Sequence, residues 1–420
     1  MPMTQRRAVI TGIGVVSPNG LGREAYWRAT AAGKSGIRRV EAFAAEHLPV
    51  EIAGQAAAFE PRDYVDEAEL RHVSRVVPLL LAASGEALAD AGIEPAALNL
   101  EQRQGIGVLV GSGGGALEFV ERQFSLYFAG SDRRCSVYTI PSATHGTLAS
   151  EVSMRFDLHG FSHLISTGCT SSTDALGYAR QHIQSGTIDT VICGGADAPL
   201  SPLIVRAFHL MKILTTRWNH EPERASRPFS KDRDGFVLGE GAWMFVVEER
   251  EHALERRAHI YGEIAGYGST CEAFHRVRLS ESAEEPARAM KMALANAELQ
   301  PEAIDYVNLH GTATVLNDRV ETRAMKRVFG PAAYGIPMSS VKSLIGHPQG
   351  ACGAAGVAAT LLAMRDGLLP PTANLEEPDP DCDLNYVPRP GQRAVIRHAL
   401  CNCIAFGSKN SALVLSATGA

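Results

Sequence analysis

The sequence predicts an α/β fold, and three observations support that prediction. Short apolar runs rich in β-branched residues alternate with helical segments along the 420 residues. Hydrophobic residues make up 45% of the chain and charged residues 20%, as is usual for a globular protein with a large core. Glycine contributes 40 of the 420 residues, which is a larger fraction than the usual share of about 7%. This excess indicates many tight turns. This composition excludes a disordered, collagenous or disulfide-stapled protein.

The first part of the chain contains five predicted strands with helices between them. Strands are expected at residues 8–16, from 106, from 163, at 190–198 and at 243–248, and helices at 79–91 and 174–184. Because strands and helices alternate, we expect a mainly parallel sheet that is covered by helices.

A second series of the same kind follows. Strands are expected at residues 260–267, 304–309, 399–406 and 411–416, and helices at 285–297, 319–329 and 350–364. We therefore predict two similar α/β halves, residues 1–255 and 256–420. No linker-like segment separates them, so we expect the two halves to share one core.

Charge and cysteine spacing exclude several classes of function. The chain has 40 basic and 46 acidic residues, a net charge of −6, and no long basic run, so we expect no nucleic-acid binding. The eight cysteines form no CxxC pair or other metal-ligand spacing, so we expect reduced thiols, no metal and a cytoplasmic location. Residues 351–364 are too short for a membrane span, and Arg6-Arg7 precedes a buried strand rather than an export signal.

Two glycine-rich turns imitate nucleotide-binding fingerprints. Residues 111–116 (GSGGGA) follow an apolar strand, but no strand that ends in an acidic residue lies about 20 residues further on. Gly12 and Gly14 lack the third small position of the fingerprint. We interpret the two segments as a tight strand-to-helix turn and as close strand packing. The absence of GxSxG argues against an α/β-hydrolase.

Residues 166–172 (STGCTSS) are the first segment with candidate chemistry. An apolar strand runs into small residues, then Cys169, then a helix. The amides and positive dipole end of a helix N-terminus lower a thiol pKa and stabilise the thiolate. We therefore expect Cys169 to be a nucleophile with a lowered pKa, with a small buried structural cysteine as the alternative.

Two further segments carry histidines after strands. Residues 308–314 (NLHGTAT) contain His310, and residues 340–347 (SVKSLIGH) contain Lys342 and His347. Taken singly, they could be core histidines and a solvated lysine. Together with Cys169 they describe a carbon–carbon bond-forming thioester site, in which a thiolate takes the acyl group and two neutral imidazoles stabilise charge on one carbonyl. A cysteine protease would leave the second histidine and the lysine unexplained.

These motifs occur with others in a recognisable order. The stretches are VITGIGVVSPNG, STGCTSS, RPFSKDRDGFVLGEGA, HGTATVLNDRVE, SSVKSLIGH, PPTANLEEPDPDCDLNYVP and CNCIAFGSKN. Over essentially its whole length the sequence resembles the β-ketoacyl-acyl carrier protein synthases of the elongating Cys-His-His type. It looks closest to the catalytic ketosynthase subunit of type II polyketide synthases, with the fatty-acid elongation enzyme as a near neighbour. The resemblance implies a thiolase-like fold of two similar halves in αβαβα layers.

The resemblance also implies an acyltransferase that performs a decarboxylative Claisen condensation. Cys169 would hold the acyl chain, while His310 and His347 bind the malonyl carbonyl and Lys342 orients the histidines. The backbone amides of Cys169 and Phe406 would form the oxyanion hole. No cofactor is expected, because the phosphopantetheine of an acyl carrier protein carries the substrates.

Further positions match supporting parts of the family's site. Two acids match those that support the Lys and His network, and two threonines match contacts to the pantetheine arm: Asp318, Glu321, Thr312 and Thr314. Gly114 and Phe406 match positions that gate the acyl pocket. Carrier proteins are acidic, so their docking surface is locally basic. The matching basic positions, which can also be ordinary surface charges, are Arg71, Arg133, Arg134 and Lys212.

Four positions in three parts of the site depart from the family pattern. The gating loop, usually Gly-Phe-Gly-Gly, is Ala405-Phe406-Gly407-Ser408, which predicts a restricted or differently shaped loop. Gly356 stands where a glutamate is usual, so one carboxylate contact is missing. Gly114 at the gate predicts a more open pocket for longer, rigid or unsaturated chains. Each difference can equally be neutral.

The resemblance leaves alternatives for activity and partners. A non-catalytic chain-length-factor-like role is disfavoured because Cys169, His310, His347 and Lys342 are all present. A thiolase or a starter enzyme that uses Coenzyme A is a weaker alternative, because starter enzymes carry one His and one Asn. We expect an acyl carrier protein as partner, and a dimer either with a homologous chain-length factor or with a second copy.

Overall fold

The computed structural model describes residues 6–45 and 47–419, in which ten strands form the main sheet path. The N-terminal strands are β1 (Ala8–Ser17), β5 (Ile106–Gly111), β6 (Ser162–Ile165), β7 (Thr190–Asp197) and β8 (Gly241–Glu249). The C-terminal strands are β9 (Gly262–Cys271), β10 (Tyr306–Asn308), β11 (Met338–Ser339), β14 (His398–Ala405) and β15 (Lys409–Ser416). The predicted strands are therefore present, with small shifts at their ends.

The two groups of strands have the same topology. The strand order is β6-β5-β7-β8-β1 in the first and β11-β10-β14-β15-β9 in the second. In each group the first three strands of this order are parallel to one another, with β5 or β10 in the middle. The remaining two pairings, β7-β8 and β8-β1 or β14-β15 and β15-β9, are antiparallel. A short antiparallel contact between β1 and β9 joins the groups, through Val9–Glu263 and Ile10–Gly262. The repeated order supports the expectation of two similar halves.

The prediction of a mainly parallel sheet is wrong. Each half has two parallel and two antiparallel pairings along its strand order. In the C-terminal half, for example, β14 turns back through residues 406–408 and pairs with β15 over its whole length. A turn of this length forces an antiparallel pairing, because a parallel one needs a crossover of about a dozen residues or more.

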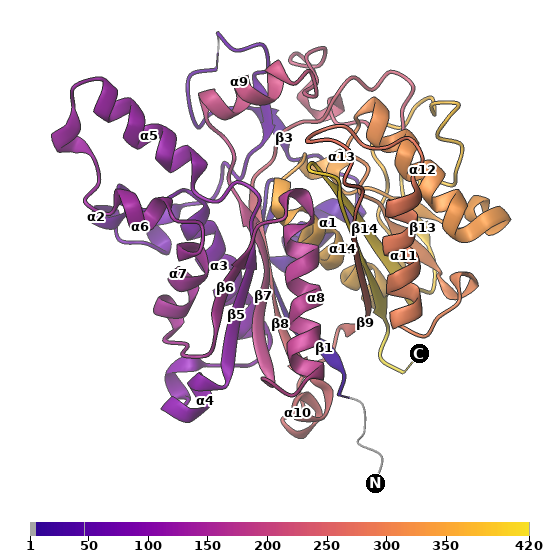
Figure 1. The fold of residues 1–420 in the computed structure, drawn as a ribbon, viewed down its shortest axis with the longest axis horizontal. Helices are drawn as coiled ribbons and strands as arrows, with labels where there is room; N and C mark the ends of the chain where they lie inside the picture. Colours follow the sequence, from indigo (N-terminus) through magenta and orange to yellow (C-terminus); the bar gives the residue numbers. More distant parts are fainter. Residues whose placement is uncertain (1–5, 46, 420) are drawn as a thin grey trace.

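The N-terminal and C-terminal groups of strands are called the first and the second sheet below. Helices cover both of these sheets and also fill the space between them (Figure 1). The helix α3 (Val76–Asp90) packs on the outer side of β1 and β8, and α11 (Glu284–Asn296) packs on β9 and β15, with α12 (Val315–Phe329) beside it. Between the sheets lie α8 (Ser171–Gln184) and α14 (Cys352–Asp366), which contact strands of both halves. The layers are therefore αβαβα, as the thiolase-like fold predicts.

The remaining elements are short or peripheral. The helices are α1 (Arg23–Ala31), α2 (Glu67–Leu70), α4 (Leu100–Gln104), α5 (Leu117–Phe128), α6 (Thr139–Ala143), α7 (Thr147–Phe156), α9 (Pro202–Leu210), α10 (Arg250–Glu255) and α13 (Lys342–Ile345). The strands are β2 (Gly20–Leu21), β3 (Ile37–Arg39), β4 (Ile52–Gly54), β12 (Leu368–Leu369) and β13 (Gln392–Arg393). Within the described ranges, no helix has both the length and the apolar character to cross a bilayer.

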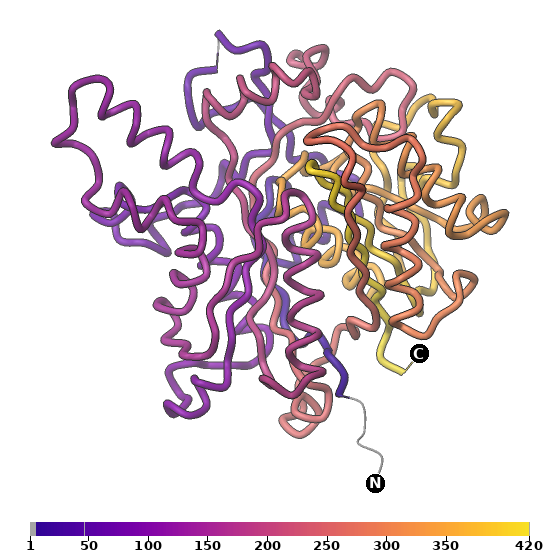
Figure 2. The backbone as a smooth tube through the Cα atoms, viewed as in Figure 1, coloured from indigo at the N-terminus to yellow at the C-terminus, as the bar shows by residue number. Residues whose placement is uncertain are grey.

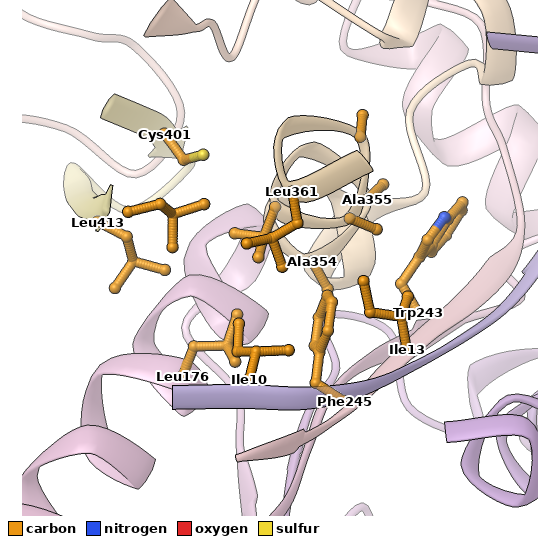
Figure 3. Packing of buried hydrophobic residues seen from close by; sticks show 14 of the residues in the cluster. Ile10, Ile13, Leu176, Trp243, Phe245, Ala354, Ala355, Leu361, Cys401 and Leu413 are labelled. Carbon is orange, nitrogen blue, oxygen red and sulfur yellow. The ribbon is translucent and has the colours of Figure 1, made fainter. Parts of the chain in front are cut away.

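The core is densest in the central helix layer. Ile10 and Phe245 from the first sheet and Leu413 from the second face Leu176 of α8 and Leu361 of α14 (Figure 3). The helices are rich in small residues because they are enclosed on several sides. A Cβ on Gly353 would lie 2.0 Å from Thr173 Oγ1, and one on Gly177 would lie 2.4 Å from the Tyr267 ring. Close helix packing thus accounts for part of the glycine excess.

The three predicted motifs meet at one edge of the two sheets. Cys169 follows β6, His310 follows β10 and Lys342 follows β11. Since β5, β6 and β7 are parallel, as are β10, β11 and β14, the carboxyl ends of these strands share an edge. The start of β1 lies toward the lower side of the molecule, while α13 lies near the upper side (Figures 1 and 2).

Candidate active site

Cys169 lies in a tight 3₁₀ turn, 168–170, immediately before α8. Gly168 has φ 72°, a left-handed conformation that glycine adopts without steric cost. The Ser171 hydroxyl donates to the Gly168 carbonyl and accepts from the Thr167 amide. The turn is thereby fixed from both sides, and it holds the buried thiol at the start of the central helix.

The predicted lowering of the Cys169 pKa is wrong. Burial raises the pKa of the Cys169 thiol well above its usual range. The positive charge of Lys342 and the nearby backbone amide of Phe406 oppose this effect without cancelling it. Desolvation, together with the neighbouring Cys352, thus keeps the pKa of this thiol raised, and the thiol holds its proton at neutral pH until a base accepts it.

His347 is an imidazole in contact with this thiol. Its Nε2 lies 3.2 Å from Cys169 Sγ. The preceding Gly346 has φ 72°, and the His347 amide donates to the Val237 carbonyl at 2.7 Å. The ring packs edge-on against Phe236, with 5.1 Å between centroids. Burial lowers the pKa of His347, so its imidazole is neutral and able to accept a proton.

His310 faces the same site from the C-terminal half. Its ring lies 5.4 Å from that of His347, at 85°, and the two rings and the Cys169 sulfur have nitrogen and sulfur atoms within 4.8 Å of one another. Burial, with the nearby charge of Lys342, lowers the pKa of His310 to about 3. This imidazole is therefore also neutral, and one of its ring nitrogens can still donate to a carbonyl.

Lys342 and Glu321 hold the backbone of His310 in place. Lys342 Nζ donates to the His310 carbonyl oxygen at 2.6 Å. The carboxylate of Glu321 accepts from the amides of His310 and Gly311, both at 2.7 Å, and from Asn402 Nδ2 at 2.6 Å. Burial raises the pKa of Glu321 to about 7, against the effect of these three donors. Glu321 thus contacts the backbone of His310, and its supporting role stays a prediction.

Asp318 supports a neighbouring loop instead. Its carboxylate accepts from the Thr312 amide at 3.1 Å and the Phe229 amide at 2.8 Å, and it pairs with buried Arg233 at 3.2 Å. Among the described residues it makes no ion pair with Lys342. Its contact is with the threonine loop that lines the cavity.

A cavity of about 320 Å³ opens onto the two histidines and Cys169. Thr312 and Thr314 line it, and their hydroxyls lie 2.9 Å apart. Lys212 and Arg278, both exposed, also line it. The remaining lining residues are Met211, Ile213, Asp234, Gly235, Phe236, Val277, Leu279, Val315, Leu316, Asn317, Ile404, Ala405 and Phe406. The structure thus brings Cys169, His310, His347 and the two predicted pantetheine threonines to one cavity, whereas Lys342 does not line it.

Several predicted residues do not line this cavity. Arg71, Arg133 and Arg134 are exposed elsewhere. Gly114 lies beside Asp197, whose carboxylate accepts from its amide at 2.9 Å, and near the Gln349 side chain. Its role as a pocket gate and the docking role of the three arginines stay predictions.

The space at Gly356 is filled by another polar side chain. A Cβ on Gly356 would lie 2.3 Å from Asn308 Oδ1. A glutamate at this position would therefore displace the Asn308 amide. Glycine at position 356, where the family usually has glutamate, thus lets α14 lie close to Asn308 at the end of β10.

The gating segment, residues 405–408, is tied to a second loop. Ser408 has φ 64°, and its hydroxyl accepts from the His275 amide at 3.2 Å and donates to the His275 carbonyl at 3.0 Å. The Gly407 amide donates to the Arg276 carbonyl at 2.9 Å. The serine that replaces the usual glycine therefore adds contacts, which supports the expectation of a restricted loop.

The sequence analysis missed four neighbours of the site. Phe236 packs on His347, and Arg278 lines the cavity. The only sequence signal for Phe236 is the motif DRDGF, which ends at this residue. Cys352 and Cys403 lie directly behind Cys169 in a buried cluster of small residues and thiols. No spacing pattern points to this pair, because 51 residues separate the two positions.

Comparison with known proteins gives one consistent family. The Beta-ketoacyl synthase, N-terminal domain family matches residues 5–253, and the Beta-ketoacyl synthase, C-terminal domain family matches residues 261–376. The 3-oxoacyl-[acyl-carrier-protein] synthase 2 of Coxiella burnetii is 40% identical over 99% of both chains. A putative polyketide beta-ketoacyl synthase 1 of Streptomyces cyaneus is 41% identical over 98% of both chains.

Solved structures agree with these relatives. A chain from a type II PKS acyl-carrier protein in complex with its ketosynthase, described as bound to the hexaketide, is 32% identical with a TM-score of 0.89, over 99% of this chain and all of that one. A chain of the ishigamide ketosynthase/chain length factor is 32% identical with a TM-score of 0.90, with the same coverage.

The fold and the site define a condensing enzyme that works through a cysteine thioester. A buried thiol is paired with one neutral imidazole and faced by another, at the shared edge of two topologically equal halves. Together with the matches over the whole chain, this shows that the protein belongs to the β-ketoacyl synthase family. Its activity is a β-ketoacyl-forming acyl transfer.

Proposed function

We propose that this enzyme elongates an acyl chain on Cys169 with malonyl units delivered by an acyl carrier protein, in type II polyketide biosynthesis. The single observation that supports the chemistry best is the 3.2 Å contact between Cys169 Sγ and His347 Nε2. A thiol that burial keeps protonated needs a base at this distance.

In the acylation step, His347 accepts the thiol proton as the sulfur attacks the incoming thioester. The amides of Cys169 and Phe406 stabilise the oxyanion, and the Phe406 amide is near enough to the sulfur to lower the pKa of the thiol. The pantetheine thiolate then leaves with the proton that His347 took up. This returns the imidazole to its neutral form before the second substrate binds.

In the condensation step, the two neutral imidazoles donate to the carbonyl oxygen of the malonyl thioester. Loss of CO2 leaves an enolate whose negative charge these donors stabilise. The enolate carbon attacks the acyl-Cys169 carbonyl, and the carbon–sulfur bond breaks. The product is a β-ketoacyl thioester two carbons longer, and the Cys169 thiolate that leaves takes a proton from solvent to return to its thiol form.

The polyketide assignment rests on three motifs: STGCTSS at residues 166–172, SPL at 201–203 shortly after GGADAP, and AHIYGEIAGY at 258–267. Fatty-acid elongation is the second candidate, since the Coxiella burnetii relative has almost the same identity as the Streptomyces cyaneus one. Mass spectrometry of the carrier-bound product, from malonyl-carrier and a set of acyl starters, separates the two. Successive unreduced extensions support the polyketide assignment, whereas a single extension of saturated starters supports fatty-acid elongation.

We further propose an acyl carrier protein as partner at the cavity mouth, where Lys212 and Arg278 can attract its acidic surface. A second subunit would cover an apolar surface formed by α5, α6 and the segment between them. The exposed side chains there are Phe124, Tyr127, Phe128, Val137 and Ile140. Phe128 is 80% exposed and Ile140 77%, a degree of apolar exposure that marks interaction surfaces. The second subunit would be a homologous chain-length factor or another copy of this chain.

A further inference from the structure

Two thiols that the condensation does not use lie behind the nucleophile. Cys352 begins α14 and Cys403 lies within β14, and their Sγ atoms are 3.6 Å apart. Both side chains are buried. Each sulfur also contacts the backbone carbonyl oxygen of Cys169, at 3.3 Å from Cys352 and 3.0 Å from Cys403.

The thiol pair faces one nitrogen atom of His310. Nδ1 of that ring lies 3.4 Å from Cys403 Sγ and 4.0 Å from Cys352 Sγ. The two sulfurs and the nitrogen thus form a triangle with edges of 3.4, 3.6 and 4.0 Å. The Cys169 carbonyl oxygen caps the two sulfurs.

This triangle has the dimensions of one face of a tetrahedral zinc site. Zinc binds thiolate sulfur at about 2.3 Å and imidazole nitrogen at about 2.0–2.1 Å. At tetrahedral angles these bond lengths place two sulfurs about 3.8 Å apart and a sulfur and a nitrogen about 3.6 Å apart. All three observed edges lie within about 0.4 Å of these values, so small side-chain movements suffice to bring the three atoms around one ion.

We propose that Cys352, Cys403 and His310 Nδ1 form a binding site for a thiophilic, tetrahedral metal ion of the Zn²⁺ class, with the Cys169 carbonyl as fourth donor. On binding, each thiol releases one proton to solvent and the two thiolates balance the charge of the ion. No oxidant or reductant is needed. The imidazole uses Nδ1 for the metal, so the hydrogen on its ring is fixed at Nε2.

A competing set of ligands exists at the same place. Cys169, His310 and His347 also have candidate ligand atoms within 4.8 Å of one another. This set offers one sulfur, whereas the proposed site offers two, and thiolate pairs select Zn²⁺-class ions. The two sets share His310 but not their sulfurs, so substitution of cysteines separates them.

The test uses a background in which the competing thiol and the exposed thiol are removed. Cys169→Ala eliminates the competing set, and Cys271→Ala removes an exposed thiol. In this background, under a phosphine reductant, Cd²⁺ is titrated as a spectroscopic probe and thiolate-to-metal charge-transfer absorption is recorded. Zn²⁺ then competes for the bound Cd²⁺. We expect one ion per chain with a two-thiolate absorption.

Single substitutions at the pair identify the ligands. We expect Cys352→Ser and Cys403→Ser to weaken Cd²⁺ binding by about 100-fold or more, because loss of an outer partner alone costs about 10- to 100-fold. Serine keeps the volume and hydrogen bonding of the thiol, and thermal unfolding checks that each variant folds. The matched control is Cys401→Ser, a buried cysteine on the same strand that bonds to Thr360 instead.

Three results would overturn the proposal. One is the lack of a charge-transfer band in the background protein. Another is equal Cd²⁺ affinity in the Cys352→Ser/Cys403→Ser double variant. The third is binding that occurs only when Cys169 is present, which would assign the ion to the competing set. None of these readouts depends on condensation activity, so the proposed function is tested separately.

Discussion

His347 and His310 have different contacts around Cys169, although both are neutral imidazoles. His347 Nε2 touches the sulfur at 3.2 Å, whereas the nearest sulfur atoms to His310 Nδ1 belong to Cys403 and Cys352. Because burial keeps the Cys169 thiol protonated, removal of its proton falls to His347. Substitution of the two histidines should therefore have different effects on the rate of acylation, although condensation needs both residues.

His347→Ala should slow transfer of an acyl group to Cys169, while His310→Ala should leave that transfer near the wild-type rate. A positioned general base contributes about 10²- to 10⁴-fold, so the expected loss for His347→Ala lies in that range. Both variants should lose condensation. Single-turnover intact-protein mass spectrometry with acyl-carrier measures the first step. Equal acylation rates in the two variants would show that His347 is not the base.

The protonation of His310 can be followed with pH. Its pKa is about 3 in the folded protein, against about 6.5 for a free histidine. Between these values the unfolded chain binds the extra proton and the folded chain does not. The contribution of His310 to stability is therefore complete above pH 6.5 and declines as the pH falls toward 3.

Histidine-labelled protein should accordingly show a His310 ring that stays neutral from pH 8 to pH 5 in ¹⁵N NMR spectra. Comparison with His310→Ala assigns the signal. Because the neutral form is the donor to the malonyl carbonyl, a flat titration supports its assigned role. A midpoint near 6.5 would mean that burial does not control this ring.

Among the elements, the gating segment departs most from the family pattern. The backbone of Ser408 has a left-handed conformation. Its hydroxyl forms hydrogen bonds with His275, which tie residues 405–408 to residues 272–276. Glycine would relieve the backbone strain but remove the hydroxyl bonds. This segment contains Phe406, whose backbone amide lies near Cys169. Movement of the segment therefore affects acylation of Cys169.

Ser408→Gly should raise amide hydrogen exchange at residues 272–276 and 406–408. Loss of the hydroxyl bonds lowers the local opening free energy by about 1–2 kcal/mol. Ser408→Ala is the matched variant, because it removes the hydroxyl and keeps the Cβ. Both should increase exchange in these loops and leave β14 protected. Unchanged exchange in both variants would mean that the hydroxyl does not restrain the loop.

The elements themselves were largely predictable, because strand-end motifs such as those around His310 and His347 leave strong local signals. The mixed pairing was not, since alternation of strands and helices does not reveal that β14 turns back into β15. The Cys169 pKa was misjudged because a helix N-terminus is visible in sequence and burial is not. Cys352 and Cys403 meet only through folding, so no spacing rule could find them.

At the scale of the whole molecule, the exposed apolar surface on α5 and α6 predicts a dimer. Phe128 and Ile140 are largely exposed there, and burial of such side chains is worth about 1.5–3 kcal/mol each. Native mass spectrometry of the protein, alone and co-expressed with a homologous genomic neighbour, measures the assembly. We expect a homodimer or a heterodimer, and Phe128→Glu should weaken it. A monomer under both conditions would contradict the prediction.

The central claim is that Cys169 carries the acyl chain during condensation, and a two-stage mass measurement tests it most directly. The protein is first mixed with acyl-carrier, and peptides are analysed for the site of the adduct. Malonyl-carrier is then added. We predict acylation of Cys169, followed by loss of the adduct and a carrier-bound β-ketoacyl chain two carbons longer. Folded Cys169→Ala should give neither species, and normal condensation by that variant would contradict the account.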